Sequence, residues 1–308
     1  MSDLKRYQGV FPAFYACYDE RGNVSPERAA RLTEHLISKG VQGLYVCGSS
    51  GECIYQDVEE RKETLRAVVE SAAGRVTIIA HVAANSTRDS ALLAAHAQSL
   101  GVDAIAAIPP IYFKLPEYAI ADYWNAISSA APDTDFFIYN IPQLAGVTLT
   151  PRLLEKMLEN PRVKGVKNSS MATLDIQTFK MIGGDDFYVF NGPDEQFLAG
   201  RLMGACGGIG GTYAAMPELF LRMDALIRAG RAQEAAPIQM DVNRIISALC
   251  ACHGNMYAVI KELLRRRGVE VGSVRSPLSP LEKQDMAQVD LCEEMIEKAV
   301  ALHTAQAL

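Results

Sequence analysis

Short β-forming runs alternate with longer helical patterns from the start of the chain to residue 229, and this alternation restricts the fold more than any other feature. The runs are apolar and predict eight strands at residues 9–15, 43–47, 76–81, 104–108, 135–140, 163–167, 187–190 and 207–210. The segments after them predict helices at residues 26–38, 58–72, 86–100, 116–130, 151–158, 171–182, 194–203 and 217–229. Strands joined by helices run parallel, because each helix returns the chain to the edge where the previous strand began.

Eight repeats of strand and helix predict an α/β fold of the closed (β/α)8 type, the TIM barrel. A doubly wound open sheet is the alternative, and it usually carries a glycine-rich phosphate loop after its first strand. Here the first predicted strand leads into the segment 16–20 (ACYDE), which contains no glycine. The sequence therefore favours the barrel.

After the last predicted barrel helix the strand patterns stop, and three further helices are predicted at residues 232–252, 257–267 and 280–305. The second of them ends in the segment 265–268 (RRRG), in which cations and a glycine are typical of a helix C-terminus. We therefore expect a barrel domain over residues 1–230 and a C-terminal three-helix domain over residues 231–308.

The charge and hydrophobicity of the chain exclude several classes of protein. The net charge is −6, whereas nucleic-acid binding needs clustered Lys and Arg against the phosphates. No apolar run reaches the roughly 18 residues of a membrane helix, and the N-terminus lacks the apolar core of a secretory signal. The seven cysteines are odd in number and scattered, which is typical of free thiols. We expect a cytoplasmic protein that binds neither nucleic acid nor a membrane.

Lys167 ends the sixth predicted strand, and in a (β/α)8 barrel the active site lies where the carboxyl ends of the strands meet the following loops. By the period of two, Val163, Gly165 and Lys167 share the face expected to line the barrel interior, while Lys164 points outward. A lysine inside a barrel is desolvated, which favours the neutral, nucleophilic amine. Taken alone, Lys167 is better explained as a solvent-exposed lysine at a strand end, since lysines are rarely buried.

Tyr139 strengthens the catalytic interpretation of Lys167. It ends the adjacent predicted strand, so its hydroxyl could face Lys167 across a short gap. A Schiff-base aldolase needs such a group to move protons between the carbinolamine, the imine and the substrate hydroxyl. A packing role at the top of the barrel is an equally good explanation of Tyr139 by itself.

The segment 48–52 (GSSGE) offers a grip for an anion. Its backbone N–H groups and the hydroxyls of Ser49 and Ser50 suit a carboxylate without supplying a full positive charge. An ordinary Gly/Ser turn is the alternative. Together with Lys167, the two serines would hold the carboxylate of a 2-oxo acid while its carbonyl carbon meets the amine.

The histidines argue against a metal-dependent aldolase. Only His81 of the five histidines falls at the predicted rim, where a metal would need several histidines and carboxylates. A lone histidine at a strand end is more often structural, and we expect this of His81. Cys250, Cys252 and His253 lack a second pair of ligands nearby, which disfavours zinc. We expect amine catalysis, with no metal and no cofactor.

Three motifs resemble those of a known family. The segments 48–52 (GSSGE), 139–142 (YNIP) and 165–167 (GVK) are similar to motifs of the dihydrodipicolinate synthase/N-acetylneuraminate lyase family, and the resemblance extends over essentially the whole chain. It implies that Lys167 forms an imine with pyruvate, that Tyr139 shuttles protons, and that Ser49 and Ser50 bind the pyruvate carboxylate. Ser50 stands where the family usually has threonine, so the hydroxyl is kept. Members are usually homotetramers in which a tyrosine of a partner subunit completes the proton relay, and Tyr112 matches that position.

The resemblance also bears on the second substrate. Dihydrodipicolinate synthases typically carry an arginine, for the carboxylate of the aldehyde partner, where this chain has Leu144, and leucine cannot form a bidentate carboxylate clamp. Gly192, Asp194 and Glu195 are similar to the segment of sialic acid lyases that binds the hydroxyls of the sugar.

Two further positions concern the sugar. Ser169 stands where those lyases have a polar hydroxyl residue. Gly211 departs from them, because they usually have a serine there that contacts the sugar. Losing one such hydrogen bond costs about 0.5–1.5 kcal/mol, and water could replace it.

The resemblance thus implies reversible cleavage of N-acetylneuraminate to pyruvate and N-acetylmannosamine. Gly211 keeps open another pyruvate aldolase or dehydratase of the family, acting on a different 2-keto-3-deoxy sugar acid. Synthesis of 4-hydroxy-tetrahydrodipicolinate is disfavoured by Leu144. A non-catalytic barrel that senses a small oxo acid is a further alternative. The role of the C-terminal helices stays open.

Overall fold

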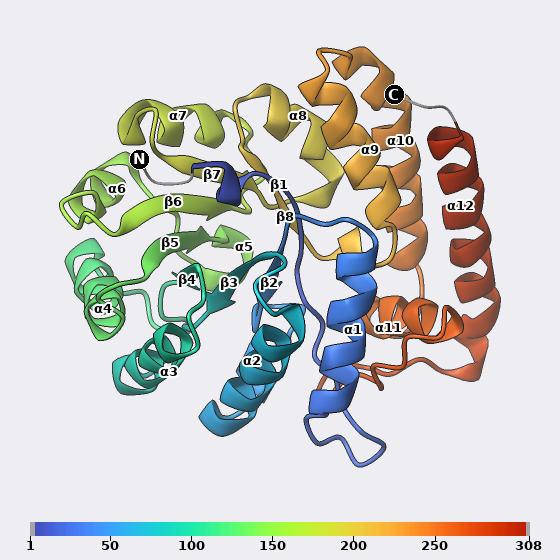
Figure 1. Ribbon diagram of the computed structural model, residues 1–308, viewed down its shortest axis with the longest axis horizontal. Helices are drawn as coiled ribbons and strands as arrows, with labels where there is room; N and C mark the ends of the chain where they lie inside the picture. The colour runs from blue at the N-terminus through green and yellow to red at the C-terminus, as the bar shows by residue number, and fades with distance from the viewer. Residues whose placement is uncertain (1–3, 306–308) are drawn as a thin grey trace.

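The structure is a computed structural model and describes residues 4–305. Parallel strands surround its centre (Figure 1), and they are β1 Gly9–Pro12, β2 Gly43–Val46, β3 Thr77–His81, β4 Ala104–Ala107, β5 Asp135–Asn140, β6 Val163–Asn168, β7 Tyr188–Asn191 and β8 Gly207–Gly210. They are hydrogen-bonded in the order β1-β8-β7-β6-β5-β4-β3-β2. Each strand therefore lies beside its neighbour in sequence, as a barrel requires.

The two ends of this sheet meet and close the barrel. Ala13, just after β1, forms a parallel bridge with Tyr45 of β2. The Phe14 N–H donates to the Tyr45 carbonyl (2.9 Å), and the Gln42 N–H donates to the Val10 carbonyl (3.1 Å). The predicted (β/α)8 barrel is confirmed.

Helices surround the strands (Figure 1), and they are α1 Pro26–Ser38, α2 Val58–Ala72, α3 Thr87–Ser99, α4 Glu117–Ala130, α6 Pro151–Met157, α7 Leu174–Gly183, α8 Phe197–Leu202 and α9 Pro217–Arg228. Their starts follow local chemistry. Ser25 Oγ accepts a hydrogen bond from the Arg28 N–H at α1 (3.4 Å), and Thr150 Oγ1 accepts one from the Leu153 N–H at α6 (3.1 Å).

Three helical segments differ from the sequence-based expectation. The helix predicted over residues 194–203 is a 3-10 turn, Asp194–Gln196, followed by α8, because the backbone at Gln196 leaves the helical region (φ −126°, ψ 25°). α7 begins at Leu174 rather than at residue 171. A short helix, α5 Pro142–Ala145, lies in the loop after β5 and was not predicted.

Side chains fill the inside of the barrel in a cluster rich in aromatic rings: Tyr7, Phe11, Tyr45, Ile79, Phe137, Tyr139, Tyr188, Phe190 and Ile209. A larger apolar cluster fills the space between the strands and the helices. The two clusters alternate along each strand, as the period of two requires. The inner rings leave room for polar groups only at the ends of the barrel.

A bulge in β6 corrects one expectation. Phe137 pairs with Gly165 while the residue before it pairs with Val163, so Lys164 has no counterpart on β5. Val163 therefore packs in the outer cluster and not in the barrel interior, because one extra residue reverses the face of the strand. From Gly165 onward the alternation holds, since a Cβ there would lie 2.5 Å from the inner ring of Phe137. Lys167 consequently points into the barrel.

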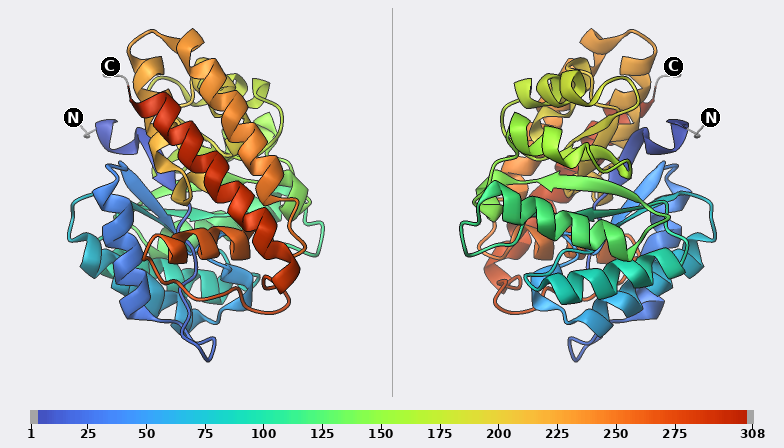
Figure 2. Two further views of the ribbon diagram at one scale, coloured as in Figure 1. Left: turned by 90° about the vertical axis from the view of Figure 1, so that its right-hand side faces the viewer. Right: turned by 90° about the vertical axis from the view of Figure 1, so that its left-hand side faces the viewer.

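The C-terminal part consists of α10 Ala232–Leu249, α11 Met256–Arg266 and α12 Met286–Thr304. α10 and α12 pack against each other and against α9, on one side of the barrel (Figure 2). The third helix begins later than predicted, after a 3-10 turn at Lys283–Asp285. The domain boundary at residues 230 and 231 stays a prediction. In the part of the chain that the structure describes, no helix combines the length and the apolar character needed to cross a membrane.

A buried ion pair joins the barrel to the C-terminal helices. Glu52 Oε1 lies 2.7 Å from Lys261 Nζ of α11, and the two side chains are 0% and 1% exposed. Glu52 Oε2 accepts a hydrogen bond from the Arg275 N–H (2.9 Å), and Lys261 also donates to the Ser273 carbonyl (2.8 Å). Glu52 therefore anchors the segment 48–52 from behind.

Replacing Lys261→Met should destabilise the protein by about 3–5 kcal/mol, because it leaves the Glu52 carboxylate buried without its cation. Urea unfolding measures the change. Lys298→Met is the matched control, since Lys298 pairs with Glu294 on the surface and its loss should cost less than about 1 kcal/mol. A loss below about 1 kcal/mol for Lys261→Met as well would show that the pair does not hold the two parts together.

Candidate active site

A cavity of about 350 Å³ opens at the carboxyl ends of the strands, where the sequence placed the active site. It is lined by residues that the sequence had selected: Ser49, Ser50, Tyr139, Lys167, Ser169, Gly192, Asp194, Glu195 and Gly211. Ile246, Cys250, Met256 and Tyr257 add a wall from the C-terminal helices. The C-terminal helices thus belong to the site, a point that the sequence had left open.

Lys167 lines this cavity. It is 4% exposed, and its Nζ lies 4.0 Å from the ring centroid of Tyr139 and 4.2 Å from that of Tyr45. Over residues 4–305 the lysines that pair with carboxylates are others, and Lys167 has no ion-pair partner. An amine without a counterion in the wall of a cavity is free to attack the carbonyl carbon of a bound ligand, as a Schiff-base nucleophile must.

The neighbouring strands hold Lys167 and Tyr139 side by side. In the β5–β6 ladder Tyr139 is the partner of Lys167, and Asn140 is the partner of Asn168. Asn140 Nδ2 donates to Asn168 Oδ1 (2.7 Å), and Asn168 Nδ2 donates to Ser170 Oγ (3.1 Å). This buried amide pair locks the two strand ends together. Sequence reasoning missed both amides, although each directly follows a predicted catalytic residue.

Ser50 lies within a group of tyrosines. Its hydroxyl interacts with the hydroxyls of Tyr15 and Tyr257, whose rings meet edge to face with centroids 5.6 Å apart. Tyr15 also donates to the carbonyl of Gly211 (3.0 Å). Burial raises the pKa of Tyr257 well above its usual value, so the phenol stays neutral. Tyr257 comes from α11, and no local pattern in the sequence indicated that it reaches the site.

Asp194 is a buried acid in the wall of the cavity. Its Oδ2 accepts hydrogen bonds from the backbone N–H (2.7 Å) and the hydroxyl (2.6 Å) of Thr212. Its Oδ1 is buried and, among the described residues, has no hydrogen-bond partner. Burial raises the pKa of Asp194 to about 6, although the bonds from Thr212 oppose the shift. Asp194 thus lies in the cavity wall with its carboxylate oxygens buried.

Two glycines shape the cavity in different ways. A Cβ at Gly192 would lie 2.0 Å from Ser169 Oγ, so a side chain there would displace Ser169. At Gly211 the nearest atoms to a Cβ would be Ser50 Oγ at 3.4 Å and Tyr15 Oη at 3.9 Å, and the φ of −73° is ordinary. Gly192 is therefore required sterically, whereas Gly211 leaves space that a small side chain could fill.

His81 is buried beside the cavity, in a network that includes Arg61. Its Nδ1 donates to the Cys47 carbonyl (3.0 Å), and Arg61 donates to the His81 and Ala83 carbonyls (2.7 Å each). Burial, and then Arg61, lower the pKa of His81 well below its usual value. Among residues 4–305, no three His, Cys, Asp or Glu side chains are grouped in a way that could hold a metal ion.

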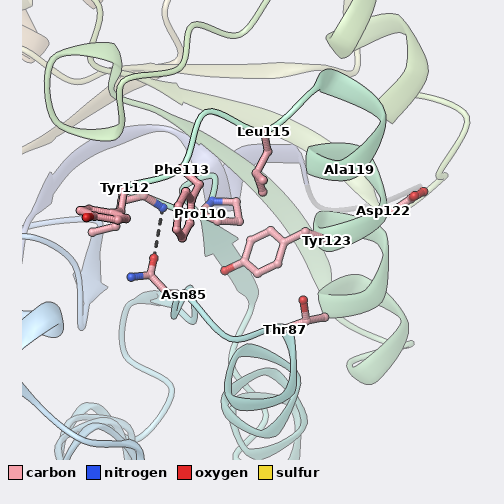
Figure 3. A pocket seen from close by; sticks show the side chains of 10 residues that line it. Asn85, Thr87, Pro110, Tyr112, Phe113, Leu115, Ala119, Asp122 and Tyr123 are labelled. Carbon is pink, nitrogen blue, oxygen red and sulfur yellow. Dashed lines mark hydrogen bonds between the residues drawn. The ribbon is translucent and has the colours of Figure 1, made fainter.

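Tyr112 lies outside this cavity. It is 89% exposed, in the left-handed region at φ 84°, which is strained for a tyrosine. Figure 3 shows it beside Phe113 at a second pocket of about 570 Å³, which Tyr123 also lines. The Ile111 N–H donates to Asn85 Oδ1 (3.1 Å) and holds this loop. Within one chain the structure does not bring Tyr112 to Lys167.

Comparison with known proteins identifies the family of this chain. The model of the dihydrodipicolinate synthetase family matches residues 6–295. The chain belongs to this family. The family resemblance expected from the three motifs is therefore confirmed.

Relatives and solved structures agree with this assignment. The chain is 60% identical, over 96% of its length and 94% of the relative, to a protein of Mediterraneibacter gnavus named N-acetylneuraminate lyase. It is 32% identical, over 96% of its length and 99% of the relative, to the N-acetylneuraminate lyase of Salmonella agona. The structure superimposes with a TM-score of 0.97 on a Ruminococcus gnavus sialic acid aldolase catalytic lysine mutant, at 59% identity over 98% of this chain and 100% of that one.

Replacing Asp194→Asn should stabilise the protein more at about pH 8 than at about pH 5. The pKa of Asp194 rises from 3.8 to about 6 on folding, so the stability contributed by its protonated form is lost as pH rises through 6. The asparagine does not ionise, and its advantage should grow by about 1–2 kcal/mol over that range. Urea unfolding at both pH values measures it. An advantage independent of pH would mean that Asp194 ionises normally.

Proposed function

We propose that this protein is a class I pyruvate aldolase that cleaves N-acetylneuraminate reversibly to pyruvate and N-acetylmannosamine through an imine at Lys167. The observation that carries the proposal is the buried, unpaired amine of Lys167 beside Tyr139. Relatives named N-acetylneuraminate lyase, at 60% and 32% identity over nearly the whole chain, support the substrate. A solved relative described as a catalytic lysine mutant supports the role of a lysine.

The chemistry follows from a buried amine that has no ion-pair partner among residues 4–305. Lys167 Nζ attacks the C2 ketone of the open-chain sugar acid, and loss of water leaves a protonated imine. Tyr139, which has given its own proton to the hydroxyl that left as water, then takes the proton of the C4 hydroxyl, and the C3–C4 bond breaks as the electrons of that bond flow into the imine. N-acetylmannosamine leaves, the resulting enamine takes a proton at C3, and hydrolysis returns pyruvate and the free lysine. The imine acts as the electron sink, so the proposed steps need no metal or cofactor.

The cavity offers groups for both ends of this substrate. We assign the carboxylate to the hydroxyls and N–H groups of Ser49 and Ser50, at the start of the loop that Glu52 anchors. We assign the sugar hydroxyls to the opposite wall, where the polar groups are Ser169, Gly192, Asp194 and Glu195.

Gly211 supports a second candidate, cleavage of another 2-keto-3-deoxy sugar acid. The space above its Cα would hold a serine hydroxyl in the lyases that the chain resembles, and here it is open. Assays of pyruvate release from a panel of 2-keto-3-deoxy acids distinguish the two. N-acetylneuraminate should give the highest kcat/KM, and a higher value for another acid would move the assignment to that acid.

Assembly completes the proposal. We infer a homotetramer in which Tyr112 reaches the site of a partner subunit, because this tyrosine is 89% exposed, has a strained backbone conformation and lies outside the cavity of its own chain. Its neighbour Phe113 is also exposed, and exposed aromatic side chains that lie together mark interaction surfaces. A cytoplasmic location stays a prediction.

Borohydride with pyruvate should add covalent mass to the wild-type protein at Lys167, located by peptide mapping. Lys167→Ala should show no adduct, and its kcat should fall at least about a thousandfold, because no other amine can form the imine. Lys164→Ala is the matched control on the same strand, and it should keep both the adduct at Lys167 and the wild-type kcat. An adduct that persists in Lys167→Ala would overturn the lysine assignment. A wild-type protein without any adduct would fit a non-catalytic oxo-acid sensor instead.

Mixing two inactive variants tests the role of Tyr112. Tyr112→Phe should lower kcat about 10²–10⁴-fold, as the loss of a proton-transfer group does. Randomly mixed oligomers of Tyr112→Phe and Lys167→Ala should recover about a quarter of the wild-type activity, since half of the pairs contain one complete site. No recovery in oligomers shown to be mixed would mean that Tyr112 does not act across the interface.

A further inference from the structure

The ring of Tyr45 lies directly beneath the amine of Lys167. Tyr45 is fully buried in the inner cluster, and its centroid is 4.2 Å from Lys167 Nζ. The ring also meets Tyr139 edge to face, with centroids 5.7 Å apart at 81°. Lys167 Nζ is therefore held between two aromatic rings, at a distance where a ring attracts a cation.

The polar groups at the Tyr45 ring, the His81 imidazole and the Tyr45 hydroxyl, are uncharged. His81 packs beside Tyr45 and Tyr139, with centroids 6.2 and 5.9 Å away. Because His81 Nδ1 donates to the Cys47 carbonyl, its Nε2 carries a lone pair. Burial raises the pKa of Tyr45 well above its usual value, so the phenol remains neutral.

The hydroxyl of Tyr45 and Nε2 of His81 complement each other. Both atoms are buried, and neither has a hydrogen-bond partner among the residues that the structure describes. The hydroxyl is a donor and Nε2 is an acceptor, so the two groups are complementary in hydrogen-bonding character. Arg61, a buried cation beside His81, does not stabilise positive charge at Lys167 Nζ.

We propose that Tyr45 is a further catalytic residue, whose ring face stabilises the positive charge that imine formation places on Lys167 Nζ. The inference rests on the proposed function, because it requires an imine at Lys167. The amine and the ketone combine with one proton, water leaves, and the nitrogen keeps the positive charge in the protonated imine. No carboxylate of the described residues pairs with this nitrogen, so the ring faces are its contacts from below.

Tyr45 and Tyr139 have different roles at Lys167 Nζ. Tyr139 lines the cavity, where its hydroxyl is assigned to proton transfer. Tyr45 lies below the cavity, within the packed barrel, where neighbouring side chains fix its orientation. A fixed ring is suited to hold charge, because it does not reorganise when the charge appears.

The test uses borohydride trapping with pyruvate in variants that change the face and the hydroxyl separately. Tyr45→Phe keeps the face and should trap pyruvate within about threefold of wild type. Tyr45→Leu removes the face and should lower the trapped fraction at a given pyruvate concentration about tenfold. Lactate, which has the carboxylate but no ketone, serves as the probe of non-covalent binding. Its competition with pyruvate should be unchanged in both variants.

The outcomes separate the inference from the proposed function. If the wild-type protein traps no pyruvate, the imine itself is absent and the proposed function fails. If the wild type traps it and Tyr45→Leu traps equally well, the ring has no catalytic role. If lactate binding falls together with trapping, Tyr45 is a packing residue that shapes the cavity.

A second series of variants tests the role of the Tyr45 ring if Tyr45→Leu does not fold. Fluorinated phenylalanines introduced at position 45 keep the shape of the ring and progressively weaken its negative face. Trapping should fall step by step with the number of fluorine atoms, while lactate binding stays constant. Trapping that is the same across the series would overturn the proposal.

Discussion

The in-register pairing of β5 with β6 is the constraint on which the site depends. It sets Tyr139 opposite Lys167 at the same level of the barrel, and the amide pair of Asn140 and Asn168 locks the next level. Because the sheet is closed, the Lys167 side chain lies between the aromatic interior below it and the cavity above it. A register shifted by one residue would turn the amine toward the helices and abolish the site.

The same pairing explains why the lysine lacks a counterion. The interior below it is filled by rings, and the acid in the cavity wall, Asp194, is committed to Thr212. The protein therefore leaves negative charge at the amine to the substrate carboxylate, which the segment with Ser49 and Ser50 would hold. Aromatic faces can stabilise a transient cation without forming the ion pair that would keep the free amine protonated.

The C-terminal helices contribute to function as well as to packing. Tyr257 reaches the hydroxyl of Ser50, and Lys261 binds Glu52 at the other end of the same loop. Both come from α11, so one helix supports the segment 48–52 from two sides. The site is therefore a joint product of the barrel and the C-terminal helices, and loosening their contact would disturb the loop before it disturbed the barrel.

Local patterns in the sequence predicted the eight strands, most helix starts and four residues of the candidate site, namely Lys167, Tyr139, Ser49 and Ser50. Periodicity and capping act over a few residues, so they can be read without the fold. The motif resemblance added Ser169, Gly192, Asp194, Glu195, Gly211 and Tyr112, and their roles stay predictions. The bulge at Lys164 could not be read, because it appears only when β6 is aligned with β5.

The contacts that define the cavity were decided by the tertiary structure. Tyr45, Asn140 and Tyr257 join the site although no local pattern in the sequence gave them a role there, and Glu52 pairs with Lys261, 209 residues away. Such contacts depend on barrel closure, which brings distant strand ends to one point. By itself the sequence determined that a lysine, a tyrosine and two serines stand at strand ends. Only the closed barrel determined that the lysine is dry, unpaired and enclosed by rings, since burial belongs to the whole fold.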